Sequence, residues 1–127
     1  MIVKISFLFA AASGGLAVLF GAFGAHGLRG RIEERLLDAF QTGVEYQMYH
    51  CLALLVVVIL MREWGRTLAL EVASYAFMLG IFLFSGSLYG LALSNIKWLG
   101  TVTPFGGLCL VVGWCALFYS CLRSIDY

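Results

Sequence analysis

Residues Val72–Ile96 read VASYAFMLGIFLFSGSLYGLALSNI, a stretch that contains no charged side chain. A helix needs about 20 consecutive apolar residues to cross the hydrocarbon core of a bilayer, which is about 30 Å thick. The stretch exceeds that length, and its glycines and serines are residues that membrane helices use where they pack together. It therefore predicts a transmembrane helix.

Three further uncharged runs accompany this stretch: Ile5–Ala25, the shorter Tyr46–Met61, and Trp98–Leu122. Together they predict an all-α integral membrane protein, a four-transmembrane-helix bundle that forms a single domain over residues 1–127. The expected spans lie near residues 5–25, 44–61, 72–94 and 104–122, with both termini on one side of the membrane. The first run is longer than the apolar core of a cleaved signal peptide, about 7–15 residues, so we expect it to be a span.

The composition favours a membrane location independently of these runs. The chain is 62% hydrophobic and 12% charged, whereas soluble domains are about 45–50% apolar and about 25% charged. A soluble fold of this size would expose much of that apolar surface to water. The lipid bilayer is therefore the expected partner, and a net charge of +1 gives no basis for nucleic-acid binding.

Basic residues leave the orientation in the membrane open. Each end of the predicted bundle carries four of them: Lys4, Arg62, Arg66 and Arg123 at one end, and Arg29, Arg31, Arg35 and Lys97 at the other. The positive-inside rule depends on an imbalance of such charges, and here there is none.

An amphipathic segment, Arg31–Thr42, lies between the first two spans. Its apolar residues recur at helical spacing on one side, with charged and polar residues on the other. A helix running unbroken from this segment to Met61 would be about 45 Å long, at about 1.5 Å per residue. That length exceeds the hydrocarbon core, so we expect the segment to lie along the surface, to project into water, or to bend near Gly43.

Small residues at regular spacing predict where the helices approach one another. Without a hydrophobic drive between helices in lipid, close backbone contact becomes the main source of packing energy. The glycines that we expect to face other helices are Gly21, Gly86, Gly90, Gly106 and Gly113. The same residues could instead form the interface of a homo-oligomer, and their spacing does not separate the two interpretations.

Polar side chains within or beside the spans are the candidate functional residues, since such groups are costly in a bilayer. They are His26, Glu45, Gln47, Tyr49, His50, Ser85, Ser87, Tyr89 and Thr103. If the spans alternate in direction, these residues gather toward one membrane face. We expect them to form a hydrogen-bonded polar layer that sets the helix register, with His26 and His50 at the same face and each hydrogen-bonded within the bundle.

Two functional interpretations compete with this structural one. A proton or ion path through Glu45 and His50 would need both side chains in one cavity. A metal site would use His26 and His50 together with Glu45, but five residues separate Glu45 from His50, which places them about 140° apart around a helix. We therefore expect no metal and no cofactor.

The remaining chemistry-bearing residues indicate no reaction. The four cysteines, Cys51, Cys109, Cys115 and Cys121, form no CxxC pair and lie in apolar runs, as small packing residues do. No nucleophile motif, phosphate-binding loop or dinucleotide fingerprint is present. The sequence thus favours a protein that is not an enzyme.

Several motifs resemble those of a known family. They are GAFGAHGL at residues 21–28, TGVEYQMYH at 42–50, FSGSLY at 84–89, TPFGG at 103–107, and the pair Gly113-Trp114. In this order they are similar to the YgdD-like family of small bacterial inner-membrane proteins of unknown function. The resemblance covers nearly the whole chain and implies a multi-pass protein of the cell inner membrane with four spans. It implies no activity, cofactor or catalytic residue.

The leading hypothesis is a small non-enzymatic membrane protein that binds lipid or a partner membrane protein through its helix faces. A homo-oligomer is a further possibility that the packing motifs leave open. The alternative function is a small transporter or an ion or proton channel that uses Glu45 and His50. A water-accessible cavity lined by both residues would favour the alternative.

Overall fold

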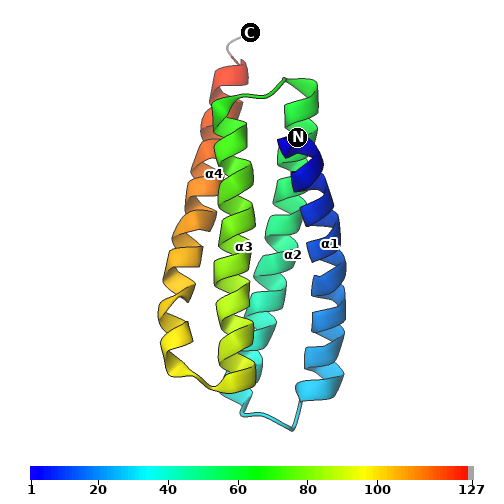
Figure 1. Cartoon of the computed structure of the whole chain (residues 1–127), viewed down its shortest axis with the longest axis vertical. Coiled ribbons are helices and arrows are strands. Elements are labelled where there is room, and N and C mark those ends of the chain that lie inside the picture. Colours follow the sequence, from blue (N-terminus) through cyan, green and yellow to red (C-terminus); the bar gives the residue numbers. More distant parts are fainter. Residues whose placement is uncertain (126–127) are drawn as a thin grey trace.

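The computed structural model describes residues 1–125, which form four long helices (Figure 1). The elements in chain order are α1 (Ile2–Ala22), a π-helical turn η1 (Phe23–Leu28), α2 (Glu34–Glu63), α3 (Leu68–Ser94), a short 3-10 helix η2 (Lys97–Thr101) and α4 (Thr103–Ile125). The predicted spans 44–61, 72–94 and 104–122 each fall within one helix, and the first, 5–25, runs from α1 into η1. All four candidate spans are long and apolar enough to cross a membrane. The predicted all-α, four-span fold is confirmed.

The helices lie side by side in the order α1, α2, α3, α4, each packed on its neighbour in the chain (Figure 1). The first residue, the α2–α3 connection and the end of α4 lie at one end of the molecule, which we call the terminal end. The α1–α2 and α3–α4 connections lie at the opposite end, the loop end. Because α1 and α4 occupy the two edges of this arrangement, α2 and α3 carry most of the buried core.

Local signals explain where α3 begins and ends. The Thr67 hydroxyl accepts a hydrogen bond from the Leu70 amide at 3.3 Å, which satisfies one of the free donors at the start of the helix. At the other end Asn95 has a φ of 53°, a left-handed conformation that asparagine tolerates and that stops the helix. These two caps set the length of the span that the uncharged stretch predicted.

Helix α2 shows how the segment Arg31–Thr42 continues into the second span. It is unbroken from Glu34 to Glu63, a length of 30 residues, so most of the segment predicted between the first two spans is the beginning of α2 itself. The segment neither lies along the surface nor interrupts the helix at Gly43. The reason is packing: Leu36, Leu37 and Phe40 are buried against neighbouring elements of the bundle rather than against lipid headgroups.

The five glycines that were expected to face other helices divide into four close contacts and one open position. A Cβ atom on Gly106 would meet the main-chain nitrogen and Cα of Phe84 in α3, and one on Gly113 would lie 2.6 Å from the ring of Phe77. Gly21 lies beside Val44 of α2, and Gly90 beside Leu99 of η2.

The expectation for Gly86 is wrong. Gly86 is exposed, and a Cβ atom there would meet nothing within 4 Å among the described residues. It therefore lies on the lipid side of α3, while Ser85 and Ser87 on either side of it are buried.

Candidate functional site

Gln47 on α2 joins three helices at the centre of the bundle. Its amide nitrogen donates to the Ser13 carbonyl of α1 at 2.7 Å and approaches the Ser13 hydroxyl at 3.0 Å. Its amide oxygen accepts a hydrogen bond from the Tyr89 hydroxyl of α3 at 2.6 Å. The side chain is only 5% exposed. Its donor and acceptor groups are thus both used inside the bundle, as a buried amide in an apolar environment requires.

Three further hydroxyl contacts connect the helices. Ser85 donates to the Gly43 carbonyl of α2 at 2.6 Å, and Ser87 pairs with Thr103 of α4 at 2.7 Å. Ser6 of α1 pairs with Ser74 of α3 nearer the terminal end. Each contact satisfies a polar group where two helix backbones approach, which is the usual role of serine and threonine in membrane helices.

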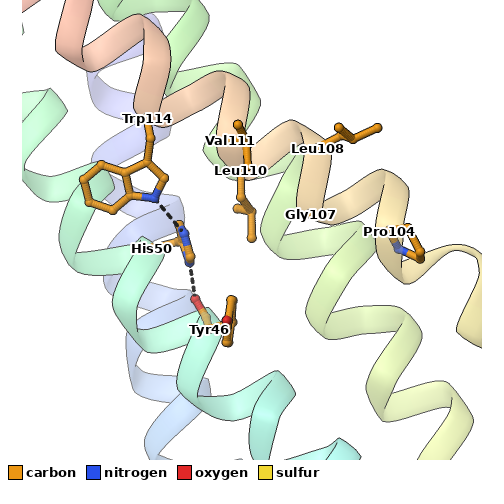
Figure 2. A pocket seen from close by; sticks show the side chains of 8 residues that line it. All are labelled: Tyr46, His50, Pro104, Gly107, Leu108, Leu110, Val111 and Trp114. Atoms are coloured by element: carbon orange, nitrogen blue, oxygen red, sulfur yellow. Dashed lines mark hydrogen bonds between the residues drawn. The ribbon is translucent and has the colours of Figure 1, made fainter.

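His50 lies deep in α2 and points toward α4 (Figure 2). The Trp114 indole nitrogen donates to His50 Nε2 at 3.0 Å, and His50 Nδ1 lies 2.7 Å from the Tyr46 carbonyl oxygen. Because Nε2 accepts the indole proton, the ring proton must be on Nδ1, which donates to the carbonyl. This assignment makes the imidazole neutral and occupies both of its nitrogens. Protonation of the ring would cost the bond to Trp114.

An open groove of about 540 Å³ lies beside this pair, between α2 and α4. We call it the α2–α4 groove; it is lined by Tyr46, His50, Pro104, Gly107, Leu108, Leu110, Val111 and Trp114 (Figure 2). His50 and Trp114 have already paired with each other, so the groove offers mainly apolar surface. Such a surface suits a hydrocarbon chain or the side chains of another helix.

The structure does not bring the predicted polar residues together in a single layer. Gln47 and Tyr89 are joined, and so are Ser87 and Thr103, but His26 is exposed in η1 and makes no hydrogen bond within the described residues. His26 is thirteen positions along the first helix from Ser13, which lies level with Gln47, so about 20 Å separates it from the level of Gln47, and His50 lies further still toward the terminal end. The layer was misplaced because α2 starts at Glu34, which carries residues 45–50 to mid-helix.

Glu45 and Tyr49 lie on the opposite side of α2 from this polar core, and both are exposed. Glu45 makes no ion pair or hydrogen bond with any group in residues 1–125. Because Ser85 bonds to the Gly43 carbonyl, Glu45 lies near the level of Ser85, and α3 continues to Ser94, about 13 Å further toward the loop end. Glu45 is therefore an exposed carboxylate at the level of apolar neighbouring helices.

The histidines, cysteines and acids do not gather into a metal site. In the described part of the chain, no three such side chains lie close enough to hold an ion. Glu45 faces outward while His50 faces the α2–α4 groove, and Glu45 does not line that groove.

Four partners in the polar core were absent from the predicted set: Ser6, Ser13, Ser74 and Trp114. Each serine lies alone in a long apolar run, where a serine is easily interpreted as a small packing residue. For Ser6 and Ser13 a signal was present: they recur at helical spacing with Ala10 and Ala17, and all four lie on the buried face of α1.

The His50–Trp114 bond should contribute modestly to stability. Replacing Trp114 with Phe keeps an aromatic ring but removes the donor, so we expect the unfolding free energy to fall by about 1 kcal/mol. His50→Gln should keep the fold at a similar cost. Trp98→Phe, at an exposed position outside the bundle core, is the matched control and should change little. Thermal unfolding in detergent, followed by circular dichroism, measures all three; an unaltered Trp114→Phe variant would contradict the bond.

Four apolar helices of membrane-spanning length, tied together by internal hydrogen bonds, define a small multi-pass integral membrane protein. A family model described as "Protein of unknown function (DUF423)" matches residues 20–107. Membrane protein YwdK of Bacillus subtilis is 39% identical over 122 residues, covering 96% of this chain and 99% of the relative. Inner membrane protein YgdD of Escherichia coli is 40% identical over 116 residues, covering 91% of this chain and 88% of the relative.

The chain belongs to this family of membrane proteins of unknown function, DUF423, and the resemblance found in its motifs is confirmed. A membrane protein of Haemophilus influenzae is similarly close, at 40% identity over 114 residues and 90% of each chain. The protein is a multi-pass protein of the cell inner membrane. No solved structure matches the chain.

Proposed function

We propose that this protein is a small non-catalytic subunit that binds a transmembrane helix of a partner membrane protein. The contact surface is the outer face of α2 around Glu45 and Tyr49 together with the adjacent α2–α4 groove. The observation that carries the proposal is the exposed Glu45 carboxylate at the depth of apolar helices. Charged groups at such depth are rare and generally face a partner or a functional cavity.

The energetic argument starts from the cost of leaving Glu45 against lipid. A carboxylate at the centre of a membrane helix costs about 2.5–3.5 kcal/mol by insertion scales, and less toward the headgroups. Within residues 1–125 nothing offsets that cost, because Glu45 makes no ion pair or hydrogen bond there. A cation or a hydrogen-bond donor from a second protein would remove the penalty, and would make binding specific.

The surface around Glu45 suits a helix. Tyr46 lines the α2–α4 groove and contacts Tyr49 at a ring-centroid distance of 6.0 Å, so the carboxylate and the groove are neighbours on one side of the bundle. Across the groove, Gly107 leaves room for close approach and Leu108 is exposed. A partner helix with small or apolar residues would pack there while a polar group reached Glu45.

A second copy of this chain fits the same face less well. Two-fold contacts bring identical patches together, so a dimer with parallel copies through this face would place Glu45 opposite Glu45. Two carboxylates in a low-dielectric environment repel unless a proton is taken up. A partner of different sequence, carrying a donor or a cation at this level, meets the charge directly.

The transporter alternative draws less support from the geometry. A path through Glu45 and His50 needs both side chains in one cavity, and they face different sides of α2. Both nitrogens of His50 are already hydrogen-bonded, which leaves no lone pair to receive a transported proton.

Site-directed photo-crosslinking in native membranes tests the proposal. A photoreactive phenylalanine at residue 49 or 108 should form an adduct with one distinct partner protein. The same group at Phe82, which is 73% exposed on α3 outside this surface, should not. Because a charge-assisted hydrogen bond contributes about 1.5–3 kcal/mol, Glu45→Leu should lower the adduct yield at residue 49 about tenfold or more. Glu45→Gln, which keeps hydrogen-bonding capacity, should retain part of it.

Three outcomes would count against the proposal. An adduct of twice the chain mass would show that a second copy occupies the surface. Adducts with lipid alone would show that no protein binds this surface. Equal yields at residues 49 and 82 would reduce the signal to random collision in the membrane.

A further inference from the structure

A second groove lies on the other side of α4, toward the terminal end of the bundle. It has a volume of about 1170 Å³ and runs between the beginning of α3 and the second half of α4, near the red end of α4 in Figure 1. We call it the α3–α4 groove. Its lining residues are Trp64, Thr67, Leu68, Ala69, Val72, Val111, Val112, Cys115, Ala116, Tyr119, Ser120, Arg123 and Ser124.

The lining changes character along the groove. At the terminal end it carries the Arg123 guanidinium with the Thr67 and Ser124 hydroxyls, and deeper in the bundle it carries Val72 and Val112. From Arg123 to Val112 the groove follows α4 for about 16 Å, at about 1.5 Å per residue. Trp64, which is half exposed, lies at the polar end, where tryptophan side chains meet the membrane–water interface. A charged head and an apolar tail in this order match the layout of a membrane lipid.

Ser120 adds a further hydroxyl to the wall of the groove. It is only 6% exposed and lines the groove, yet its hydroxyl makes no hydrogen bond with any group in residues 1–125. The neighbouring Ser124 hydroxyl, in contrast, donates to the Cys121 carbonyl at 2.9 Å. No buried side-chain oxygen or nitrogen in the described residues lacks a partner, so the Ser120 hydroxyl must be accessible from the groove, where it can donate to an acceptor.

Arg123 provides charge complementarity to an anion. Its guanidinium lies 6.0 Å from the centre of the Tyr119 ring, a cation–π arrangement that holds it beside the groove, and it forms no ion pair within residues 1–125. Arg66 lies at the same end, but its guanidinium already donates to the Glu71 carboxylate at 2.6 and 2.8 Å. None of the residues that line the groove is acidic.

We propose that the α3–α4 groove binds an anionic glycerophospholipid, with the phosphate at Arg123 and an acyl chain along Val72 and Val112. The ester and phosphate oxygens accept hydrogen bonds from Arg123 and from the Ser120 and Thr67 hydroxyls. The site is distinct from the partner-binding surface: of the residues that line the two grooves, they share Val111 alone. Guanidinium–phosphate pairing is strong and directional, so the headgroup rather than the chain gives the preference.

Native mass spectrometry of the detergent-purified full chain tests this site. Phosphatidylglycerol or phosphatidylcholine is added at equal concentration, and the retained lipid is counted. The wild-type protein should retain one phosphatidylglycerol in preference to phosphatidylcholine. Arg123→Gln should lower phosphatidylglycerol retention about tenfold. Arg62→Gln is the matched control, since Arg62 is exposed at the same end but does not line the groove.

A second pair of variants tests the acyl-chain path. Cys115→Trp should fill the groove and reduce retention of both lipids, whereas Leu19→Trp, on the exposed face of α1, should not. Equal losses for Arg123→Gln and Arg62→Gln would reduce the effect to general surface charge and overturn the proposal. Full retention in Cys115→Trp would do the same, and so would displacement of the lipid by inorganic phosphate, which would identify a site for a free anion.

Discussion

Replacing Gly106 with alanine should lower the unfolding free energy by about 3 kcal/mol or more, the upper range for overpacking a core. The added methyl group would meet the main-chain nitrogen and Cα of Phe84, where α4 crosses α3 most closely. Main-chain atoms cannot rotate out of the way as a side chain can, so the two helices would have to separate. Thermal unfolding in detergent, followed by circular dichroism, measures the loss.

Gly86→Ala is the matched control for this prediction. Gly86 lies in a helix as Gly106 does, but a methyl group there meets no atom within 4 Å in the described part of the chain. Its unfolding temperature should stay the same or rise slightly, since alanine favours helix more than glycine does. Equal destabilisation by both substitutions would mean that α3 and α4 contact each other through different faces.

Replacing Gln47 with methionine should lower the unfolding free energy by about 2–3 kcal/mol. Methionine keeps a similar length but leaves the Tyr89 hydroxyl without its acceptor and the Ser13 carbonyl without its donor. Since Gln47 joins α1, α2 and α3, the loss should appear mainly as detachment of α1. Protease cleavage of the α1–α2 connection should therefore become faster in this variant.

A double-mutant cycle isolates the Gln47–Tyr89 bond. Tyr89→Phe removes only the hydroxyl, and the coupling energy with Gln47→Met should be about 0.6–1.7 kcal/mol, the range found between membrane helices. Tyr49→Phe removes an exposed hydroxyl two positions away and serves as the control, with coupling near zero. Additive effects of Gln47→Met and Tyr89→Phe would show that the two side chains do not interact.

The four spans could be predicted because charge-free runs of bilayer length leave few alternatives. The beginning of α2 could not, since its first turns carry Arg35 and Asp38 and resemble a surface segment. Whether such a segment is part of a span depends on tertiary contacts, here the burial of Leu36 and Phe40. Hydropathy registers the charges on the outer face but not those contacts.

The rotation of each helix about its axis was the harder part of the prediction. Gly86 and Gly90 have the spacing of a packing motif, yet Gly86 faces outward and Gly80, outside that motif, is the glycine against Leu110. In the same way, Gln47 faces the core while Glu45, two positions away, faces lipid. Nearly uniform hydrophobicity around a membrane helix removes the contrast that identifies the inner face of a soluble helix.

The site could be predicted as a set of residue types but not as an arrangement. Gln47, Tyr89, Ser87 and Thr103 were singled out as polar residues in a bilayer, and the structure joins them in pairs. Trp114 was expected only as part of a family motif, since the pairing of its indole with His50 depends on how α4 lies against α2.

The lipid exposure of Glu45 is the premise of the partner-binding proposal, and a spin label at residue 45 tests it most directly. The label is attached through cysteine in a background without the native cysteines, in liposomes that contain only this protein. We expect frequent collisions with oxygen and few with a water-soluble nickel chelate, as for a label at the exposed Val56. Collisions with the chelate as frequent as at Gly30, in the α1–α2 connection, would place residue 45 in water and contradict the account.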